Sequence, residues 1–182
     1  MSLIDIKNLT FSYETSFENI FEDVSFQIDT DWKLGFIGRN GRGKTTLLNL
    51  LLGKYDYRGK ISASVTFDYF PFEVEDKSRT TIDIIDSINN SYEVWELNRE
   101  LSLLDVDQDV LYRPFETLSN GEQTKVLLAA LFLKEQNFLL LDEPTNHLDE
   151  EGKETIAEYL KKKKGFILVS HDRDFLDKII DH

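Results

Sequence analysis

One glycine-rich segment limits the folds open to this chain more than any other feature of its sequence. Residues 38–45 read Gly-Arg-Asn-Gly-Arg-Gly-Lys-Thr and match the pattern G-x-x-x-x-G-K-[ST] in full. A short apolar run, residues 34–37, leads into the segment, and residues 45–52 follow it as a strongly apolar helix. A buried strand, a glycine-rich turn and a helix in this order predict a phosphate-binding loop in an α/β protein.

Each part of this loop has a chemical reason to be there. Glycines let the backbone approach an anion closely, and the following helix adds the positive end of its dipole and its unpaired amides. We expect Lys44 to bring its charge to the β- and γ-phosphates and the hydroxyl of Thr45 to ligate Mg²⁺. The residues expected to contact phosphate are Gly38, Arg39, Asn40, Gly41, Arg42, Gly43, Lys44, Thr45 and Thr46.

A phosphate loop also needs groups that hold Mg²⁺ and activate water, and two carboxylates at the end of a second apolar run can supply them. Residues 138–141 are Phe-Leu-Leu-Leu, and Asp142 and Glu143 follow them. At the tip of a buried strand, Asp142 is placed to hold Mg²⁺ directly or through water. Glu143, one residue further, points elsewhere and is a candidate general base for an attacking water.

Strand and helix patterns along the chain predict its architecture. Apolar residues alternate with period two over residues 3–13, 24–28 and 61–69, which we expect to be strands, the first of them in a separate antiparallel portion. Later strands at residues 138–141 and 166–169 alternate with helices, which favours a mainly parallel sheet. The later helices are expected at residues 122–134, 150–164 and from 173 onward.

The segment after Pro71 has a different character from the strands before it. From Thr81 to about Leu104 the apolar residues recur at intervals of three and four, the helical spacing. This acidic stretch predicts a small helical subdomain inserted at about residues 72–120.

Composition excludes several classes of protein. The chain has 182 residues and no cysteine, so disulfides and thiolate metal sites are excluded. No run approaches the ~20 apolar residues of a membrane span, and residues 1–13 do not resemble a signal peptide. We therefore expect one cytoplasmic domain over residues 1–182, with no direct membrane insertion.

Charge is unevenly distributed within a net charge of −13. Residues 31–60 hold seven basic against two acidic side chains, whereas residues 68–111 hold twelve acidic against three basic ones. The basic segment indicates either an anionic ligand bound locally or ordinary scatter. Four lysines at residues 161–164 are expected to close a helix before Gly165, where cations meet the negative end of the dipole.

Residues 118–123, Leu-Ser-Asn-Gly-Glu-Gln, resemble the L-S-G-G-E/Q signature of the ATP-binding-cassette (ABC) ATPases. They lie between the loop and the Asp-Glu pair, as that family orders its motifs, and they also read as an S-x-x-E capping box opening a helix. The resemblance implies a P-loop NTPase fold of the ABC cassette type that hydrolyses ATP with Mg²⁺. It further implies that Ser119, Asn120, Gly121 and Glu122 contact ATP held by a second cassette, in the full-length chain or in a homodimer.

Two further segments, residues 142–149 (Asp-Glu-Pro-Thr-Asn-His-Leu-Asp) and residues 170–177, resemble the ABC-F branch. Residues 8–14 and 31–44 resemble the first cassette of its antibiotic-resistance members from Gram-positive bacteria, the lincosamide, streptogramin A and pleuromutilin type. ABC-F proteins carry two cassettes in one chain and act on ribosomes, so the resemblance implies a C-terminally truncated fragment that reaches the ribosome through regions outside it.

The resemblance also assigns roles to three single residues. It implies that Asp149 contacts the partner cassette and that His171 contacts the γ-phosphate and orients Glu143. Tyr13 lies where the family places an aromatic that stacks on adenine, although a tyrosine at the end of a strand also serves ordinary packing.

Two departures from the family pattern affect the expected activity. Asn120 replaces a glycine of the signature, and Phe72 falls where the family has a magnesium-contacting glutamine; both favour slow or altered hydrolysis. Two alternatives stay open at this point: the ATP-binding subunit of a membrane transporter, and a non-catalytic interaction module gated by nucleotide.

Overall fold

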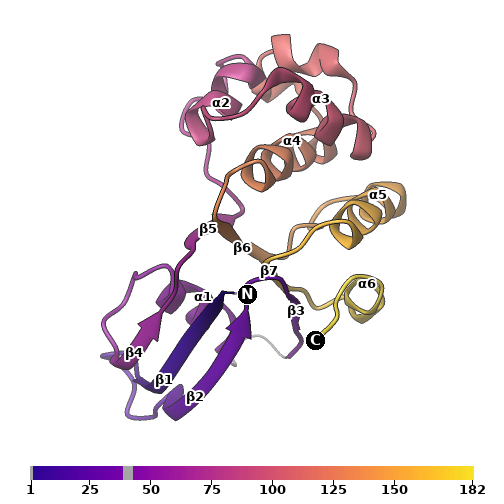
Figure 1. The fold of residues 1–182 in the computed structure, drawn as a ribbon. Helices are drawn as coiled ribbons and strands as arrows, with labels where there is room; N and C mark the ends of the chain where they lie inside the picture. Colours follow the sequence, from indigo (N-terminus) through magenta and orange to yellow (C-terminus); the bar gives the residue numbers. More distant parts are fainter. Residues whose placement is uncertain (1, 39–42) are drawn as a thin grey trace. The chain divides into compact units, whose positions relative to one another are not determined.

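The strands of residues 2–38 and 43–182, which the computed structural model describes, form two sheets (Figure 1). The first is antiparallel, in the order β2-β1-β4, with β1 at Leu3–Phe11, β2 at Phe21–Asp29 and β4 at Arg58–Ser62. The core sheet has the order β3-β7-β6-β5, in which β7 pairs in parallel with both β3 and β6. Its strands are β3 Lys33–Phe36, β5 Thr66–Phe70, β6 Asn137–Asp142 and β7 Phe166–Val169. The predicted antiparallel portion and parallel core are therefore confirmed.

The helices fall close to the segments predicted for them. They are α1 Lys44–Leu51, α2 Thr81–Ile88, α3 Val94–Leu103, α4 Asn120–Phe132, α5 Glu150–Lys161 and α6 Arg173–Asp177. Two short 3₁₀ helices, Gln108–Tyr112 and Phe115–Thr117, precede α4 and were not predicted. In the described ranges no helix combines the length and apolarity needed to cross a bilayer.

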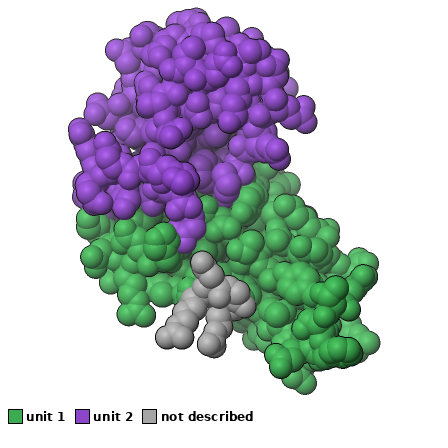
Figure 2. Space-filling view, turned by 180° about the vertical axis from the view of Figure 1, so that it is seen from behind, with its two compact units in different colours: residues 1–69, 136–142, 164–182 green, residues 70–135, 143–163 purple. Residues whose placement is uncertain are grey.

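The chain separates into two compact units, coloured differently in Figure 2. Unit 1 comprises residues 1–69, 136–142 and 164–182, and holds the two sheets with α1 and α6. Unit 2 comprises residues 70–135 and 143–163, and holds α2 to α5. The backbone passes from unit 1 to unit 2 directly after Asp142, so the predicted Asp-Glu pair straddles this boundary.

Helix α1 is the centre of the core of unit 1. It is apolar around most of its circumference, as expected of a helix that is covered on several sides. One buried cluster joins it to β1, β2, β6 and β7, and each fully buried leucine contributes about 2 kcal/mol relative to an exposed one. The buried residues of α1 are Thr46, Leu47, Leu48, Leu50 and Leu51.

The prediction of one strand over residues 61–69 was wrong. The chain leaves the antiparallel sheet at Ser62 and enters the core sheet at Thr66, so the segment contributes to β4 and then to β5. Ala63 and Ser64 are exposed in the connection between the two strands. Because three residues separate the strands, the apolar alternation continues in phase across the break and conceals it.

The helical spacing predicted from Thr81 to Leu104 is present as two helices with a turn between them. Asn89 ends α2 in an extended conformation, with φ −147° and ψ 114°. Its side-chain oxygen accepts a hydrogen bond of 3.0 Å from the amide of Ser91. This local bond gives the backbone an alternative to continuing the helix, which is why asparagine often terminates helices and begins turns.

A buried acid in unit 2 changes the interpretation of the lysine run. α5 ends at Lys161, as the dipole argument predicts, but Lys163 reaches Glu100 of α3 with 2.5 Å between Nζ and Oε2. The side chain of Glu100 is only 1% exposed, and it also accepts a hydrogen bond from Tyr159. Burial, and next the charge of Glu100, raise the pKa of Tyr159 well above its ordinary value, so the phenol remains a donor.

We expect Lys163→Met to lower the free energy of unfolding by about 3 kcal/mol, because it leaves the buried carboxylate of Glu100 without its main countercharge. Urea unfolding followed by circular dichroism measures this loss. The matched control is Lys162→Met, which removes the same charge at an exposed neighbour and is expected to change stability by no more than about 0.5 kcal/mol. Equal losses in the two variants would contradict a specific role for the Lys163–Glu100 pair.

Candidate nucleotide-binding site

The start of α1 has the geometry of an anion site. Gly43, its N-cap, has φ +90°, and a Cβ there would meet Cγ2 of Ile20 at 3.0 Å, so the position favours glycine. Because the cap has no side chain, it does not compete for the first amides of the helix. The Lys44 ammonium donates a hydrogen bond back to the carbonyl oxygen of Gly38. The predicted phosphate contacts of residues 39–42 (Arg39, Asn40, Gly41 and Arg42) lie outside the described residues.

The two predicted magnesium ligands lie together in unit 1. The hydroxyl of Thr45 donates to Oδ2 of Asp142, 3.4 Å away, although 97 residues separate them in sequence. Hydroxyl and carboxylate oxygens are the donors that Mg²⁺ prefers, and it is commonly held by one or two protein groups together with phosphates. The described residues contain no cluster of three or more His, Cys, Asp or Glu that would form an all-protein metal site. The donor set therefore fits a magnesium ion that arrives with a phosphate ligand.

Tyr69 also belongs to this site, although its place there was not predicted from the sequence. Its hydroxyl donates to the same Oδ2 of Asp142, at 2.8 Å. Burial, followed by the hydrogen bond to Asp142, raises the pKa of Tyr69 above its ordinary value, so that the phenol keeps its proton. The period-two pattern reveals which face of the strand Tyr69 occupies, but it does not reveal that the strand ends beside Asp142.

The structure connects Tyr13 to the helix of the phosphate loop. The hydroxyls of Tyr13 and Thr46 are 2.6 Å apart, so the predicted phosphate residue Thr46 has its side chain engaged with Tyr13. The Tyr13 ring packs edge-on against Phe11 and Tyr55, at centroid distances of 5.0 and 5.6 Å. Tyr55 is 39% exposed, so this aromatic group reaches the surface. Stacking of Tyr13 on adenine stays a prediction.

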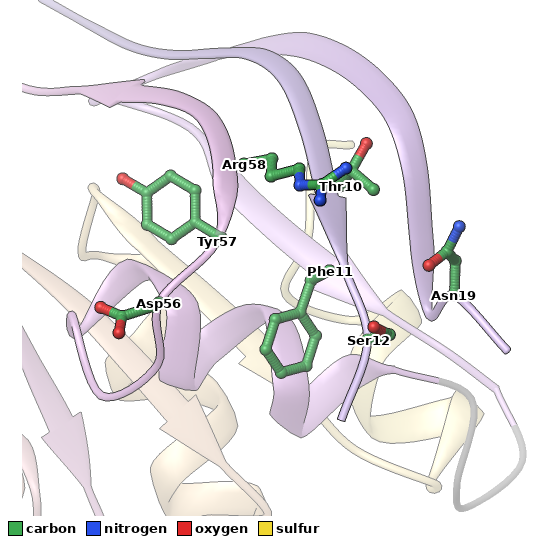
Figure 3. Close-up of a pocket in the computed structure, with 7 residues that line it drawn as sticks. All are labelled: Thr10, Phe11, Ser12, Asn19, Asp56, Tyr57 and Arg58. Carbon is green, nitrogen blue, oxygen red and sulfur yellow. The ribbon is translucent and has the colours of Figure 1, made fainter. Parts of the chain in front are cut away.

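A hollow of about 410 Å³ adjoins these aromatic residues on the antiparallel sheet (Figure 3). Phe11, whose ring contacts Tyr13, forms part of its wall, and Asp56 and Arg58 contribute one charge of each sign. In the described part of unit 1, none of the residues predicted to bind nucleotide lines it. Its lining residues are Thr10, Phe11, Ser12, Asn19, Asp56, Tyr57 and Arg58.

The loop after β6 contains two residues in the left-handed region. Glu143 has φ +49° and His147 has φ +66°. Positive φ is uncommon for residues other than glycine, and such residues gather at functional sites. The predicted role of Glu143 as a base is not tested by this conformation and stays a prediction.

In unit 2 the predicted partner-cassette contacts surround a single hollow of about 400 Å³. Lys125 and His147 also line it, and neither was predicted to do so. Lys125 lies four residues after Gly121 on α4, and this helical spacing was the available signal. The predicted contacts that line the hollow are Ser119, Asn120, Gly121, Glu122 and Asp149.

The predicted capping box at the start of α4 is confirmed. The Ser119 hydroxyl accepts from the amide of Glu122 at 3.1 Å, and the amide of Ser119 donates to Oε1 of Glu122 at 2.9 Å. Asn120 is the first residue of the helix and does not have the positive φ that glycine would serve. The backbone therefore tolerates asparagine in place of glycine at this position, because the residue is helical there and needs no left-handed conformation.

Gly121 has more room than its place in the motif would suggest. A Cβ there would meet Cδ2 of Leu148 at 3.7 Å and Oγ of Ser119 at 4.0 Å, both ordinary contact distances. Among the described residues, none lies close enough to Gly121 to require a glycine there.

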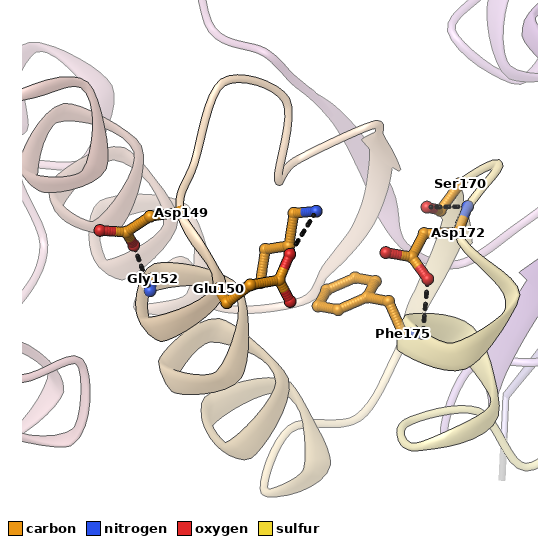
Figure 4. A network of polar contacts seen from close by, with 7 residues as sticks. Asp149, Glu150, Gly152, Ser170, Asp172 and Phe175 are labelled. Carbon is orange, nitrogen blue, oxygen red and sulfur yellow. Dashed lines mark hydrogen bonds and ion pairs between the residues drawn. The ribbon is translucent and has the colours of Figure 1, made fainter.

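Two aspartates of the motifs cap helices, one in each unit (Figure 4). In unit 2, Oδ1 of Asp149 accepts from the amide of Gly152 at 2.7 Å and begins α5. In unit 1, Oδ1 of Asp172 accepts from the amide of Phe175 at 3.0 Å, and the Asp172 amide donates to Oγ of Ser170 at 3.1 Å. His171 lies exposed in this fixed turn directly after β7.

Comparison with known proteins identifies the chain. A family model described as ABC transporter matches residues 21–146, which include the phosphate loop, the signature and the Asp-Glu pair. The chain belongs to the ABC transporter family. It is an ATP-binding cassette of that family, and cassettes of this kind generally hydrolyse ATP.

Relatives of this cassette match it over almost its whole length. The ABC transporter F family member 2 of Arabidopsis thaliana is 31% identical over 188 residues, covering 99% of this chain and 27% of that protein. The ribosome protection protein VmlR of Bacillus subtilis is 35% identical over 184 residues, covering 96% of this chain and 32% of that protein. The cassette thus spans about a third of the length of the curated relatives it matches.

A solved structure has the same fold as the cassette. The dimeric structure of a bacterial ABC transporter cassette superposes with a TM-score of 0.77 at 19% identity, over 96% of this chain and 90% of that one. The ABC cassette fold predicted from the sequence is therefore confirmed.

We expect Ser119→Ala to destabilise the cassette by about 1 kcal/mol, because it removes the side-chain cap of α4. Thermal or urea unfolding of the cassette without nucleotide measures the loss. Ser102→Ala, at an exposed position of α3 that caps no helix start, is the control and is expected to be neutral or slightly stabilising. A neutral Ser119→Ala would mean that the capping box contributes nothing to the stability of α4.

Proposed function

We propose that this cassette binds ATP with Mg²⁺ at the start of α1 and the end of β6. One observation supports the proposal most strongly. The hydroxyl of Thr45, the residue after Lys44, lies 3.4 Å from the carboxylate of Asp142. Thr45 and Asp142 are the residues we assign to the cation. Bound there, the cation would neutralise charge on the phosphates.

Within this site each protein group has a separate task. Lys44 exchanges the Gly38 carbonyl for a phosphate oxygen, and the amides at the start of α1 point at the same anion. Glu143 takes the proton of the attacking water, while His171 contacts the γ-phosphate and orients Glu143. Tyr13 provides the face on which adenine stacks.

We propose that hydrolysis requires a second cassette. The capped start of α4 lines one hollow through Ser119, Asn120, Gly121 and Glu122, together with Asp149. A helix start is a favourable place for a phosphate, so the γ-phosphate of ATP held by a partner cassette is the ligand that suits this hollow. The room beside Gly121 is consistent with close approach by that partner.

We further propose that the cassette is one half of a twin-cassette ABC-F protein of the cytoplasm, with residues 72 to about 120 forming its helical subdomain. The similarity to an F family member and to a ribosome protection protein supports this proposal. In that protein, closure of the two cassettes around ATP and their reopening after hydrolysis would move regions outside this chain on the ribosome and protect it from an antibiotic.

Two other functions have an observation in their favour. The match to the family model described as ABC transporter favours the ATP-binding subunit of a membrane transporter. Phe72, which has no ligating atom, favours a non-catalytic module that closes with ATP but does not turn it over. Co-sedimentation with ribosomes separates the first from our proposal, and single-turnover hydrolysis by the two-cassette protein separates the second.

We expect Lys44→Ala to weaken ATP binding about 10- to 100-fold, because it removes a charge-assisted hydrogen bond to phosphate. Isothermal titration calorimetry with ATP and Mg²⁺ measures the change. Lys60→Ala removes the same charge from an exposed position on β4 and serves as the control. An unchanged affinity in Lys44→Ala would remove the basis of the proposed function.

We expect Glu143→Gln, made in the two-cassette protein, to keep ATP affinity within about twofold and to lower hydrolysis by 10² to 10⁴, the range for loss of a general base. The trapped, closed form should then sediment with ribosomes in the presence of ATP to a greater extent than the unaltered protein. Hydrolysis at the unaltered rate would show that another group is the base.

A further inference from the structure

Asp142 receives two hydrogen bonds of unequal quality at one oxygen. The Tyr69 hydroxyl lies 2.8 Å from Oδ2, within the usual range for O–H···O bonds, whereas the Thr45 hydroxyl lies 3.4 Å from it. The phenol of Tyr69 is therefore the tighter constraint on the orientation of this carboxylate. In the described residues, both of these bonds fall on Oδ2, which leaves Oδ1 as the oxygen available to another ligand.

Its strand and a neighbouring cation support the phenol of Tyr69. Tyr69 belongs to β5, which neighbours β6 in the core sheet, and Asp142 is the last residue of β6. The ammonium of Lys54 lies 5.4 Å from the centroid of the Tyr69 ring and adds a cation–π contact on its face. These contacts favour the orientation in which the half-buried Tyr69 side chain directs its hydroxyl at Asp142.

We propose that Tyr69 is a positioning residue that holds Asp142 with Oδ1 directed to the magnesium ion of bound ATP. The inference rests on the proposed function, because it requires the cation to be held by Asp142. A neutral donor suits this task, since it fixes one oxygen of the carboxylate without cancelling the negative charge that attracts the cation. Groups that orient a metal ligand in this way usually contribute a factor of about 10 to 100 to metal affinity.

The neighbourhood in sequence explains why this task falls to Tyr69. The side chain of Phe72, three residues later, has no nitrogen or oxygen atom to ligate a metal or to hydrogen-bond with water. Tyr69 is thus the polar side chain that the described end of β5 brings to Asp142. A hydrogen bond that only joined β5 to β6 would contribute to stability and would leave the Mg²⁺ dependence of ATP binding unchanged. A positioning role for Tyr69 would change that dependence.

The test is the dependence of ATP affinity on Mg²⁺ concentration, measured by isothermal titration calorimetry for the chain and for Tyr69→Phe. We expect the variant to bind ATP in EDTA within about twofold of the unaltered chain, and to need about 10-fold more Mg²⁺ for the half-maximal gain in affinity. Tyr57→Phe removes a hydroxyl elsewhere in unit 1 and is expected to leave the Mg²⁺ requirement unchanged. Introduced into Asp142→Ala, Tyr69→Phe should cause no further change, because the carboxylate it orients is gone.

The outcomes separate the two proposals. If the unaltered chain gains affinity with Mg²⁺ and Tyr69→Phe gains it at the same concentration, the role of Tyr69 is overturned and the proposed function stands. A loss of thermal stability in Tyr69→Phe with an unshifted Mg²⁺ requirement leads to the same conclusion, since it is the result of a structural tie. If the unaltered chain shows no ATP binding, or none that responds to Mg²⁺, both proposals are overturned.

Discussion

The burial of α1 is the constraint on which the arrangement of unit 1 depends. An eight-residue helix with five buried positions is too short and too apolar to exist alone in water, and the antiparallel and core sheets both contribute residues to the cluster that covers it. Because that burial fixes the axis of the helix, it also fixes the direction in which its first amides, Lys44 and Thr45 present themselves. The phosphate loop is accordingly followed by a helix that five buried side chains hold in place.

Most of the fold could be predicted from the sequence because its strands and helices differ strongly in period. β7 was predicted with its observed bounds, since a run of four apolar residues between a glycine and a serine has few other interpretations. The exception was residues 61–69, where the local pattern is correct for a strand on both sides of the break. Strands distant in sequence decide which sheet each half of this segment joins. The alternation of apolar residues carries no information about those partner strands.

In the site, too, features set by neighbouring residues or by motif chemistry could be predicted, whereas the other contacts between residues distant in sequence could not. The pairing of Thr45 with Asp142 follows from motif chemistry, and the capping box of Ser119 follows from a spacing of three residues. Tyr69 and Lys163 were missed or misinterpreted, because each acquires its role from a group that only the fold brings near. Glu100 illustrates this most clearly: in the sequence it is one acid among many, and in unit 2 it is a buried charge that needs a countercharge.

Asp149 performs a task within the chain at the very place where a partner is proposed to bind. Its carboxylate is the cap of α5, so a neighbouring molecule that attracts this group competes with the helix for it. Any such competition would loosen the opening turn of α5, whose last residue, Lys161, lies two residues before Lys163 of the buried Lys163–Glu100 pair. A partner that docks beside Asp149 would therefore lower the stability of the first turn of α5.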